Sequence, residues 1–313
     1  MKKLLTVLVL CLCLVGCSNE NEKIRVGVIQ LVQHDALDAA TAGFKETLEK
    51  EFGENVVVDV QNASGDSATC ATIASNFVND GYDLIMCNAT PALQAAVHST
   101  DSIPILGTSV TEYGVALGID GFNGLVGKNV SGTSDLAPLD QQAQMIIDLV
   151  PSVNTVGLIY CSSEANSIYQ VNKVEEYLTS KGLKVEKFSF ADTSTVDAVV
   201  NEACSRIDAL YVPTDNVCAD NGAIIANAAN KYNIPIVTGE KSTLITCEGL
   251  ATLSIDYHDL GVTTANMAIR ILKGEAKIEE MPIEYFENPV KIISKKAADK
   301  FGVTIPSDFE VEE

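Results

Sequence analysis

The feature that most constrains this chain is an alternation of strands and helices that runs through the sequence twice, in the same order. Short runs rich in β-branched residues alternate with amphipathic stretches of helical period. This pattern is typical of a parallel sheet with helices on both faces. In the first series we predict strands at 24–30, 56–60, 82–87 and 103–106, with helices at 36–50, 67–79 and 91–98.

The second series begins near residue 154. We predict strands at 154–160, 183–188, 209–212 and 234–237, with helices at 167–180, 196–206 and 219–232. Three segments of the two series correspond in order, among them Ile103-Pro104-Ile105-Leu106 and Ile234-Pro235-Ile236-Val237. The repeat predicts an α/β fold of two doubly wound parallel-sheet lobes with one topology. The chain has 313 residues, which is enough for two domains.

Charge and composition limit the partners of this chain. It has 42 Asp and Glu residues against 21 Lys and Arg, which argues against nucleic acid and against docking on anionic lipid. Three His residues and the absence of a CxxC motif argue against a structural zinc site. No GxSxG or GxxxxGKS/T motif occurs, and no GxGxxG follows either first strand. We therefore predict no metal, no cofactor and no enzymatic activity.

The first residues read as an export signal. Lys2 and Lys3 precede an apolar run at 4–15, which ends in Leu14-Val15-Gly16-Cys17. This ending matches the lipobox of bacterial lipoproteins, in which the cysteine is lipidated and becomes the new N-terminus. We predict a signal peptide at 1–16, a lipid anchor on Cys17, a tether at 17–23 and a place on the extracytoplasmic face of a bacterial membrane. A plain secretory signal and an uncleaved anchor are the alternatives.

Six cysteines then remain in the folded part of the chain. An even number outside the cell permits disulfides. However, these cysteines follow apolar runs or lie in helical stretches, where cysteine often serves as a small buried hydrophobe. We predict mostly free thiols at Cys70, Cys87, Cys161, Cys204, Cys218 and Cys247.

The residues that follow the predicted strands are the candidates for a ligand site. Ligands of open parallel sheets bind beyond the carboxyl ends of the strands, and two facing lobes place two such edges across one cleft. In the first lobe these segments are 30–35, 88–90 and 108–109. In the second lobe they are 162–167, 214–216 and 239–240, and 254–256 lies where the chain crosses back.

The chemistry of these segments suits an amino acid. Helix starts near Thr90 and Ser167 offer N–H groups and hydroxyls to a carboxylate, although capping alone would also explain Thr90. Asp215 is our first choice for an ammonium partner, with Glu164 and Asp256 next, and helix capping is its alternative role. His34 lies in a strand-end loop, and we weigh ligand contact evenly against a purely structural role for it.

Several stretches resemble extracytoplasmic solute-binding proteins of ABC importers, within the family that includes tryptophan- and tyrosine-binding lipoproteins. No single motif is diagnostic, but six occur in order between residue 24 and the helix that ends near Gly274. They are Val26-Gly27-Val28-Ile29-Gln30-Leu31-Val32-Gln33-His34, Ala89-Thr90-Pro91-Ala92, Gly132-Thr133-Ser134-Asp135, Ser163-Glu164-Ala165-Asn166-Ser167, Val212-Pro213-Thr214-Asp215-Asn216 and Ile255-Asp256-Tyr257.

The resemblance implies a periplasmic-binding-protein type I fold, with two lobes joined by a three-strand hinge. We expect lobe 1 at 24–133 plus 256–283 and lobe 2 at 134–255 plus 284–313. The resemblance also implies a monomer that captures an amino acid, often aromatic, and delivers it to a membrane permease. The implied ligand contacts are Gln33, His34, Asn88, Ala89, Thr90, Thr108, Ser109, Glu164, Asn166, Ser167, Thr214, Asp215, Asn216, Glu240 and Asp256.

Two departures from the family pattern leave the identity of the amino acid open. Asn88 follows Cys87 where small apolar residues are expected, and Glu240 stands where relatives often have Asp or Ser. Two alternatives also stay open at this point. One is a sugar- or nucleoside-binding protein of the same fold, and the other is a surface adhesin, which the lipid anchor fits equally well.

Overall fold

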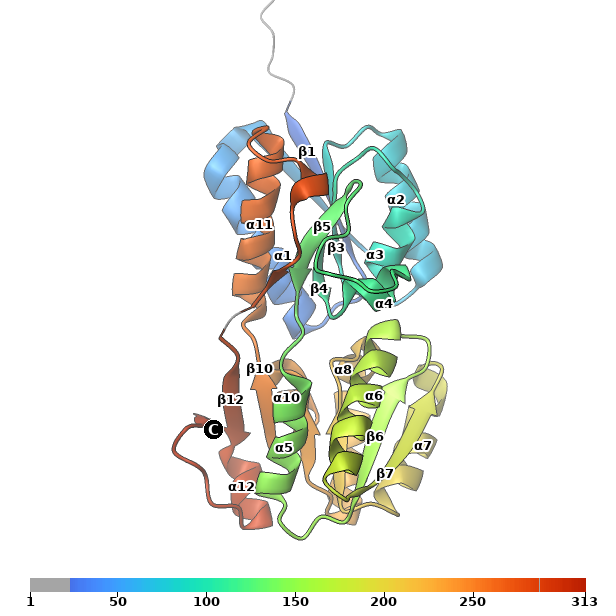
Figure 1. The fold of residues 1–313 in the computed structure, drawn as a ribbon, viewed down its shortest axis with the longest axis vertical. Helices are drawn as coiled ribbons and strands as arrows, with labels where there is room; N and C mark the ends of the chain where they lie inside the picture. Colours follow the sequence, from blue (N-terminus) through green and yellow to red (C-terminus); the bar gives the residue numbers. More distant parts are fainter. Residues whose placement is uncertain (1–22, 287) are drawn as a thin grey trace, which may run out of the picture.

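Two lobes of similar architecture are joined end to end by three crossing segments (Figure 1). The structure, a computed structural model, describes residues 23–286 and 288–313. The predicted signal peptide, the predicted lipidation site Cys17 and the predicted tether up to residue 22 lie outside the described residues. None of the helices among the described residues is both long enough and apolar enough to span a bilayer.

The first lobe is built on a six-stranded parallel sheet of order β11-β5-β4-β3-β1-β2. Its strands are β1 (Ile24–Gln30), β2 (Val56–Asn62), β3 (Leu84–Asn88), β4 (Ile105–Val110), β5 (Val130–Ser134) and β11 (Glu284–Tyr285). Its helices are α1 (Asp35–Phe52), α2 (Ser67–Asn79), α3 (Thr90–Val97), α4 (Tyr113–Leu117) and α11 (Tyr257–Leu272).

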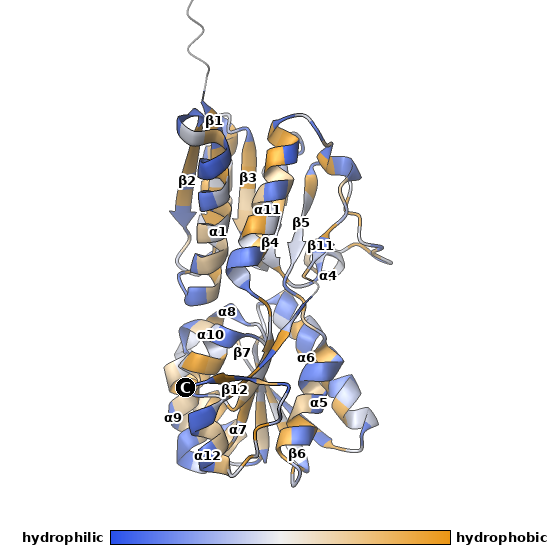
Figure 2. Ribbon diagram, turned by 90° about the vertical axis from the view of Figure 1, so that its left-hand side faces the viewer, coloured by the Kyte–Doolittle hydropathy of each residue, from blue (hydrophilic) through white to orange (hydrophobic). Residues whose placement is uncertain are grey.

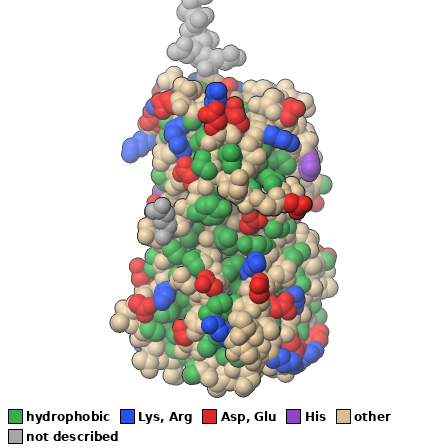
Figure 3. All heavy atoms as spheres, in the orientation of Figure 1, with side chains coloured by type: hydrophobic (Ala, Val, Ile, Leu, Met, Phe, Trp, Pro, Cys, Tyr) green, Lys and Arg blue, Asp and Glu red, His purple; other side chains and the backbone are tan. Residues whose placement is uncertain are grey.

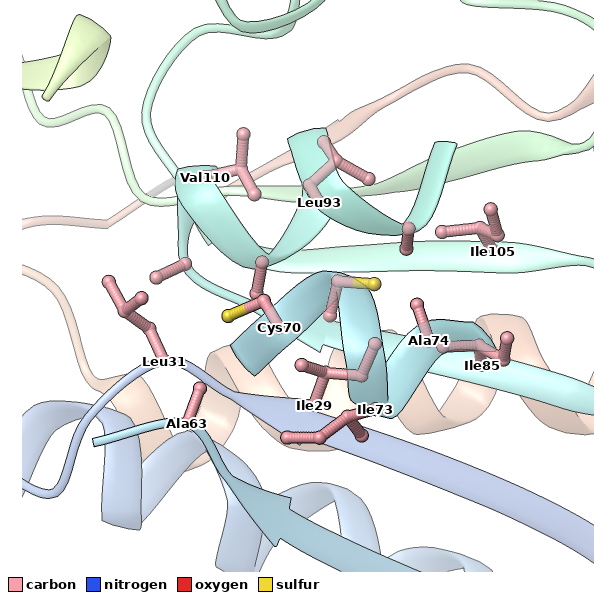
Figure 4. Packing of buried hydrophobic residues seen from close by; sticks show 14 of the residues in the cluster. Ile29, Leu31, Ala63, Cys70, Ile73, Ala74, Ile85, Leu93, Ile105 and Val110 are labelled. Carbon is pink, nitrogen blue, oxygen red and sulfur yellow. The ribbon is translucent and has the colours of Figure 1, made fainter. Parts of the chain in front are cut away.

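Alternation along β1 explains why helices cover both faces of this sheet. Val26 and Val28 point to one face and pack with Phe44 of α1. Ile29 points to the other face and packs with Ile73 of α2, among the residues drawn in Figure 4. All three strand residues are fully buried, as expected for a central parallel strand. Figure 2 shows the same layering, since hydrophilic positions lie on the outer faces of the helices.

The second lobe repeats the design with a seven-stranded sheet of order β13-β12-β10-β9-β8-β6-β7. Its strands are β6 (Thr155–Cys161), β7 (Lys184–Phe190), β8 (Ala209–Val212), β9 (Ile236–Thr238), β10 (Ala251–Ser254), β12 (Val290–Ser294) and β13 (Glu310–Glu312). Only the β10–β12 pair is antiparallel. Its helices are α5 (Leu139–Leu149), α6 (Ala165–Ser180), α7 (Val196–Cys204), α8 (Asn216–Asp220), α9 (Gly222–Tyr232), α10 (Lys241–Thr246) and α12 (Lys295–Phe301).

The predicted repeat is confirmed by the order of the strands. In each lobe the first strand lies between the second and the third, so that β2-β1-β3-β4-β5 corresponds to β7-β6-β8-β9-β10. This order is the doubly wound one, in which the chain reverses its direction of travel across the sheet beside the first strand. The six cysteines at 70, 87, 161, 204, 218 and 247 are free and buried, as the apolar surroundings predicted.

The structure corrects two details of the sequence analysis. The helix predicted at 219–232 is two helices, because the chain bends at Asn221 and Gly222 approaches Thr246 closely. The lobe boundaries also move. Ser134 and Tyr285 are paired in the first sheet, so both crossings that were placed at 133–134 and 283–284 lie further along the chain.

Helix α11 ties the end of the hinge to the first lobe. It packs along α1 at a close approach made possible by two glycines. A Cβ atom on Gly43 would lie 2.2 Å from the carbonyl oxygen of His258, and one on Gly261 would lie 2.0 Å from that of Ala40. The two backbones can therefore touch only because neither position has a side chain.

Candidate functional site

A narrow cavity lies between the lobes, at the carboxyl ends of their central strands. Both lobes and the hinge contribute to its wall, and Figure 3 shows the lobes in contact along the boundary on the face that it draws. The lining residues are His34, Ala36, Leu37, Ser109, Thr111, Asp135, Asn166, Thr214, Asp215, Asn216, Ala219, Glu240 and Tyr257. None of these described lining residues is Lys or Arg.

Strained backbone shapes the first-lobe side of the site. Ser109 has a φ of 53°, at a shift in the β4–β5 register between Gly107 and Val110. Ala89, at the start of α3, has a φ of 96°. Such conformations cost about 1–3 kcal/mol for a residue other than glycine, and they concentrate at functional sites.

Asp215 lines the cavity, and each of its carboxylate oxygens accepts a backbone N–H group. Oδ1 accepts the N–H of Cys218 at 2.8 Å and so caps α8, and Oδ2 accepts the N–H of Cys161 at 2.7 Å. The second bond joins β6 to the segment after β8. Burial raises the pKa of Asp215, while these two N–H groups act in the opposite direction. Its first role in the fold is therefore to hold two strand ends together.

Glu164 is engaged in a similar way. Oε2 accepts from the side-chain Nδ2 and the backbone N–H of Asn216, and also from Nδ2 of Asn166. Oε1 accepts the N–H of Val217 at 3.2 Å. Burial and the nearby charge of Asp215 raise the pKa of Glu164. The carboxyl of Glu240 likewise caps α10 through the N–H groups of Ser242 and Thr243.

Asp135 differs from these acids because one of its oxygens has no partner. Oδ2 accepts the hydroxyl of Tyr257 at 2.9 Å, whereas Oδ1 is buried without a hydrogen bond. Burial raises the pKa of Asp135 to about 6. A buried carboxylate oxygen left unpaired is costly, so this position is arranged for a donor or a cation that enters the cavity.

Three more polar atoms on the cavity wall are buried without partners. They are His34 Nδ1, Ser109 Oγ and Asn166 Oδ1. Most buried polar atoms in proteins are hydrogen-bonded, so four orphans around one small space indicate a missing polar ligand. Among the described residues there is no cluster of His, Cys, Asp or Glu that could hold a metal ion.

The predicted contact residues fall into four groups. His34, Ser109, Asn166, Thr214, Asp215, Asn216 and Glu240 line the cavity. Glu164 lines a second space between the lobes, which Asn216 shares. Asn88, Ala89, Thr90, Thr108 and Ser167 are buried and line neither space. Gln33 and Asp256 are exposed, and Asp256 caps α11 by accepting the N–H of Asp259.

Sequence reasoning missed Ala36, Leu37, Thr111, Asp135, Ala219 and Tyr257. Thr111 and Asp135 directly follow β4 and β5, so the strand-end rule would have found them had both strands been placed correctly. The strand predicted at 103–106 ends four residues before β4 does, and β5 was not predicted because Val130-Ser131-Gly132-Thr133-Ser134 has almost no apolar residue. Both Asp135 and Tyr257 do lie in stretches that carried the family resemblance.

Comparison with known proteins gives the family. The sequence profile of the ABC transporter substrate binding protein family matches residues 25–312. The chain belongs to this family of substrate-binding proteins. A tyrosine-binding protein from Clostridioides difficile strain R20291 is 35% identical over 289 residues, which is 90% of this chain and 83% of the relative.

Solved structures show the type I periplasmic-binding-protein fold and also the state of the lobes. An L-Trp complex from Streptococcus pneumoniae is 33% identical, with a TM-score of 0.87 over 92% of this chain and 99% of that one. The ligand-free, open structure of a substrate-binding protein with adhesive properties from Clostridium difficile is 35% identical over the same shares, but its TM-score is only 0.70. The lobes of this substrate-binding protein are therefore arranged as in the L-Trp complex and are closed.

Proposed function

We propose that this substrate-binding protein captures one free amino acid with an aromatic side chain and delivers it to the permease of an ABC importer. The observation that carries the proposal is the unpaired Oδ1 of Asp135 on the wall of the cavity between the lobes.

Asp135 is the partner that we assign to the ligand ammonium. Asp215, our first choice from sequence, uses both carboxylate oxygens for backbone N–H groups, and Asp256 is exposed. The carboxylate of Asp135 has a free oxygen, and the hydroxyl of Tyr257 fixes its other oxygen. A charge-assisted hydrogen bond from the ammonium would pair this buried charge.

The remaining orphans supply further contacts for the polar groups of an amino acid. Ser109 Oγ is a hydroxyl donor for a carboxylate, and Asn166 Oδ1 is an acceptor for an N–H group. Ala36, Leu37 and Ala219 give the cavity apolar wall for a side chain. The aromatic class rests on the relatives, one of which is a tyrosine-binding protein and another an L-Trp complex.

Calorimetric titration tests this function directly. The purified protein should bind tyrosine or tryptophan, and it should not bind leucine, glucose or adenosine with comparable affinity. Binding of a sugar or nucleoside in preference to every amino acid would contradict the proposal and indicate a sugar- or nucleoside-binding protein of the same fold. We further propose that the protein acts without catalysis, as a monomer, from a lipid anchor on Cys17 at the extracytoplasmic membrane face.

A second candidate function is surface adhesion. The relative with adhesive properties is 35% identical over 92% of this chain, which supports a shared property. Beads coated with this protein should then adhere to cultured cells, and soluble protein should compete. Adhesion equal to that of beads coated with serum albumin would remove this candidate and leave the transport proposal untouched.

A further inference from the structure

One imidazole nitrogen on the cavity wall has neither a protein partner nor an assigned ligand group. Nδ1 of His34 is buried and has no hydrogen-bond partner. Its other nitrogen, Nε2, lies 3.3 Å from Oδ1 of Asn216. His34 belongs to the loop after β1 in the first lobe, and Asn216 begins α8 in the second lobe, so this contact exists only when the lobes are closed.

The surroundings of Asn216 decide which nitrogen of His34 carries the proton. The amide nitrogen Nδ2 of Asn216 donates to Oε2 of Glu164 at 2.6 Å. The carboxylate of Glu164 accepts four N–H groups. If the amide of Asn216 were flipped, its oxygen would face this carboxylate, the bond from Nδ2 would be lost and two negative atoms would lie together. Oδ1 of Asn216 therefore faces His34, where only an N–H can be its partner.

The proton of a neutral imidazole at this position is consequently on Nε2. Nδ1 then carries a lone pair and is an acceptor, since a neutral imidazole has one donor and one acceptor. A buried acceptor without a protein partner is stabilised by a donor from the ligand. The ammonium already has Asp135, which holds the charged and unpaired oxygen.

From this geometry we infer that His34 selects ligands whose aromatic ring carries a hydrogen-bond donor, such as a phenol O–H or an indole N–H, over ligands with an unsubstituted ring. The inference rests on the proposed function and names the residue that sets its specificity. A site built to bond a polar ligand group rejects an analogue that lacks the group, because its own buried atom is then left unpaired. The selection for a ring donor arises when the lobes close, because His34 Nε2 contacts Asn216 only in the closed arrangement.

The test uses ring isosteres that differ in donor capacity. L-tyrosine and 4-amino-L-phenylalanine carry a donor, whereas 4-fluoro-L-phenylalanine and L-phenylalanine do not. L-tryptophan is matched by 3-benzothienyl-L-alanine, in which sulfur replaces the ring N–H. Calorimetric titration should show at least tenfold tighter binding for the donor in whichever pair binds, which corresponds to about 1.4 kcal/mol.

One variant and one control test whether His34 Nδ1 selects the ring donor without disturbing the contact that His34 makes with Asn216. His34→Gln keeps an amide at the position of Nε2, and thus a partner for Asn216, but places no acceptor at the position of Nδ1. It should lower the affinity for the donor ligand about tenfold and leave the donor-free isostere within threefold of wild type. His98→Leu is the matched control, because His98 is exposed and lines neither cleft space, and it should change nothing.

Three results would overturn the inference. The first is a wild-type preference below threefold, and the second is an undiminished preference in His34→Gln. The third is an equal loss for both ligands in that variant, which would mean that Nδ1 accepts from the ammonium. Failure of every aromatic amino acid to bind would be a different outcome, since it would overturn the proposed function and this inference together.

Discussion

The hydroxyl of Tyr257 donates to Oδ2 of Asp135 at 2.9 Å, across 122 residues of sequence. Asp135 follows the last large strand of the first sheet, and Tyr257 is the first residue of the helix by which the chain re-enters that lobe. The bond thus links two of the three crossings between the lobes. It also orients the one cavity carboxylate that keeps an oxygen free, so the hinge and the candidate ammonium site share a residue pair.

Replacing Asp135 tests the ammonium assignment. Asp135→Asn keeps the shape of the side chain but removes its charge. We expect ligand affinity to fall by a factor equivalent to about 2–5 kcal/mol, because the ammonium would be buried without an opposite charge. Calorimetric titration with the best aromatic amino acid measures the loss. The Tm of the ligand-free variant should not fall, since the wild-type carboxylate is itself incompletely paired.

Asp215→Asn is the matched control for that experiment. It places a second amide at the cavity wall but disturbs the bonds to the N–H groups of Cys161 and Cys218. We expect a lower Tm in the ligand-free state, because a cap and a bond between strand ends weaken. Normal stability with a large loss of affinity in Asp215→Asn, alongside unchanged affinity in Asp135→Asn, would return the ammonium to Asp215.

Ligand affinity should depend on pH below neutrality. Burial raises the pKa of Asp135 to about 6 in the ligand-free protein, and a bound ammonium would lower that pKa because it stabilises the charged form. The complex then holds fewer protons than the free protein. Affinity should therefore be level above pH 7 and fall by up to tenfold per pH unit below 6. Titrations at pH 7.5, 6.5, 5.5 and 4.5 measure this.

In the absence of ligand, the raised pKa of Asp135 makes the folded protein less stable as the pH rises. A folded-state pKa of about 6 against an unfolded value near 3.8 means that the folded chain binds the proton more tightly. Asp135 thus costs the fold up to about 3 kcal/mol, a penalty that develops as the pH rises from 4 through 6. Asp135→Asn should gain stability over wild type at pH 7.5 and lose that gain at pH 4. An equal difference at both pH values would contradict the assignment.

The close approach of α1 and α11 predicts that a larger residue at their contact lowers the stability of the fold. Gly261→Ala places a Cβ atom 2.0 Å from the carbonyl oxygen of Ala40, so one helix must move. Overpacking of this kind costs about 1–3 kcal/mol, and we expect Tm to fall by several degrees. Asn266→Ala, at an exposed position of the same helix, is the control and should leave Tm unchanged. Equal melting of both variants would show that the helices separate freely.

Ligand binding should close the molecule in solution. A ligand at a hundredfold excess over Kd adds about 2.7 kcal/mol to the free energy of unfolding, and Tm should rise accordingly. The radius of gyration in solution scattering should fall when the ligand is added, because a ligand that contacts both lobes favours the closed arrangement over an open one. A tight ligand that leaves the scattering curve unchanged would argue against hinge closure.

Membrane attachment depends on Cys17 in our proposal. Cys17→Ala should either release the protein into the medium or leave it as an unprocessed precursor, because the lipid has no thiol to join. Fractionation and immunoblotting of producing cells measure both outcomes. Cys70→Ala, which removes a buried thiol of the folded part, should stay with the membrane. Continued processing and membrane association of Cys17→Ala would point to a plain secretory signal or another anchor.

The sequence by itself determined the architecture of this protein. Strands such as 24–30 and 209–212 and the helix at 67–79 were predicted to the residue, because buried parallel strands and amphipathic helices leave a strong local pattern. The repeat of that pattern also predicted two lobes and placed the ligand at their strand ends. The polar strand β5 was not predicted, because Ser131, Gly132 and Thr133 show no alternation of apolar and polar residues.

Only the tertiary structure decided which acid is free to meet a ligand. Asp135 and Asp215 look alike in sequence, because each lies within three residues of the end of a strand. The oxygens of Asp215 are used by the N–H groups of Cys218 and Cys161, the latter 54 residues away, whereas one oxygen of Asp135 has no partner. Hydrogen bonds between distant segments depend on how strands pair and lobes close, which no local pattern encodes.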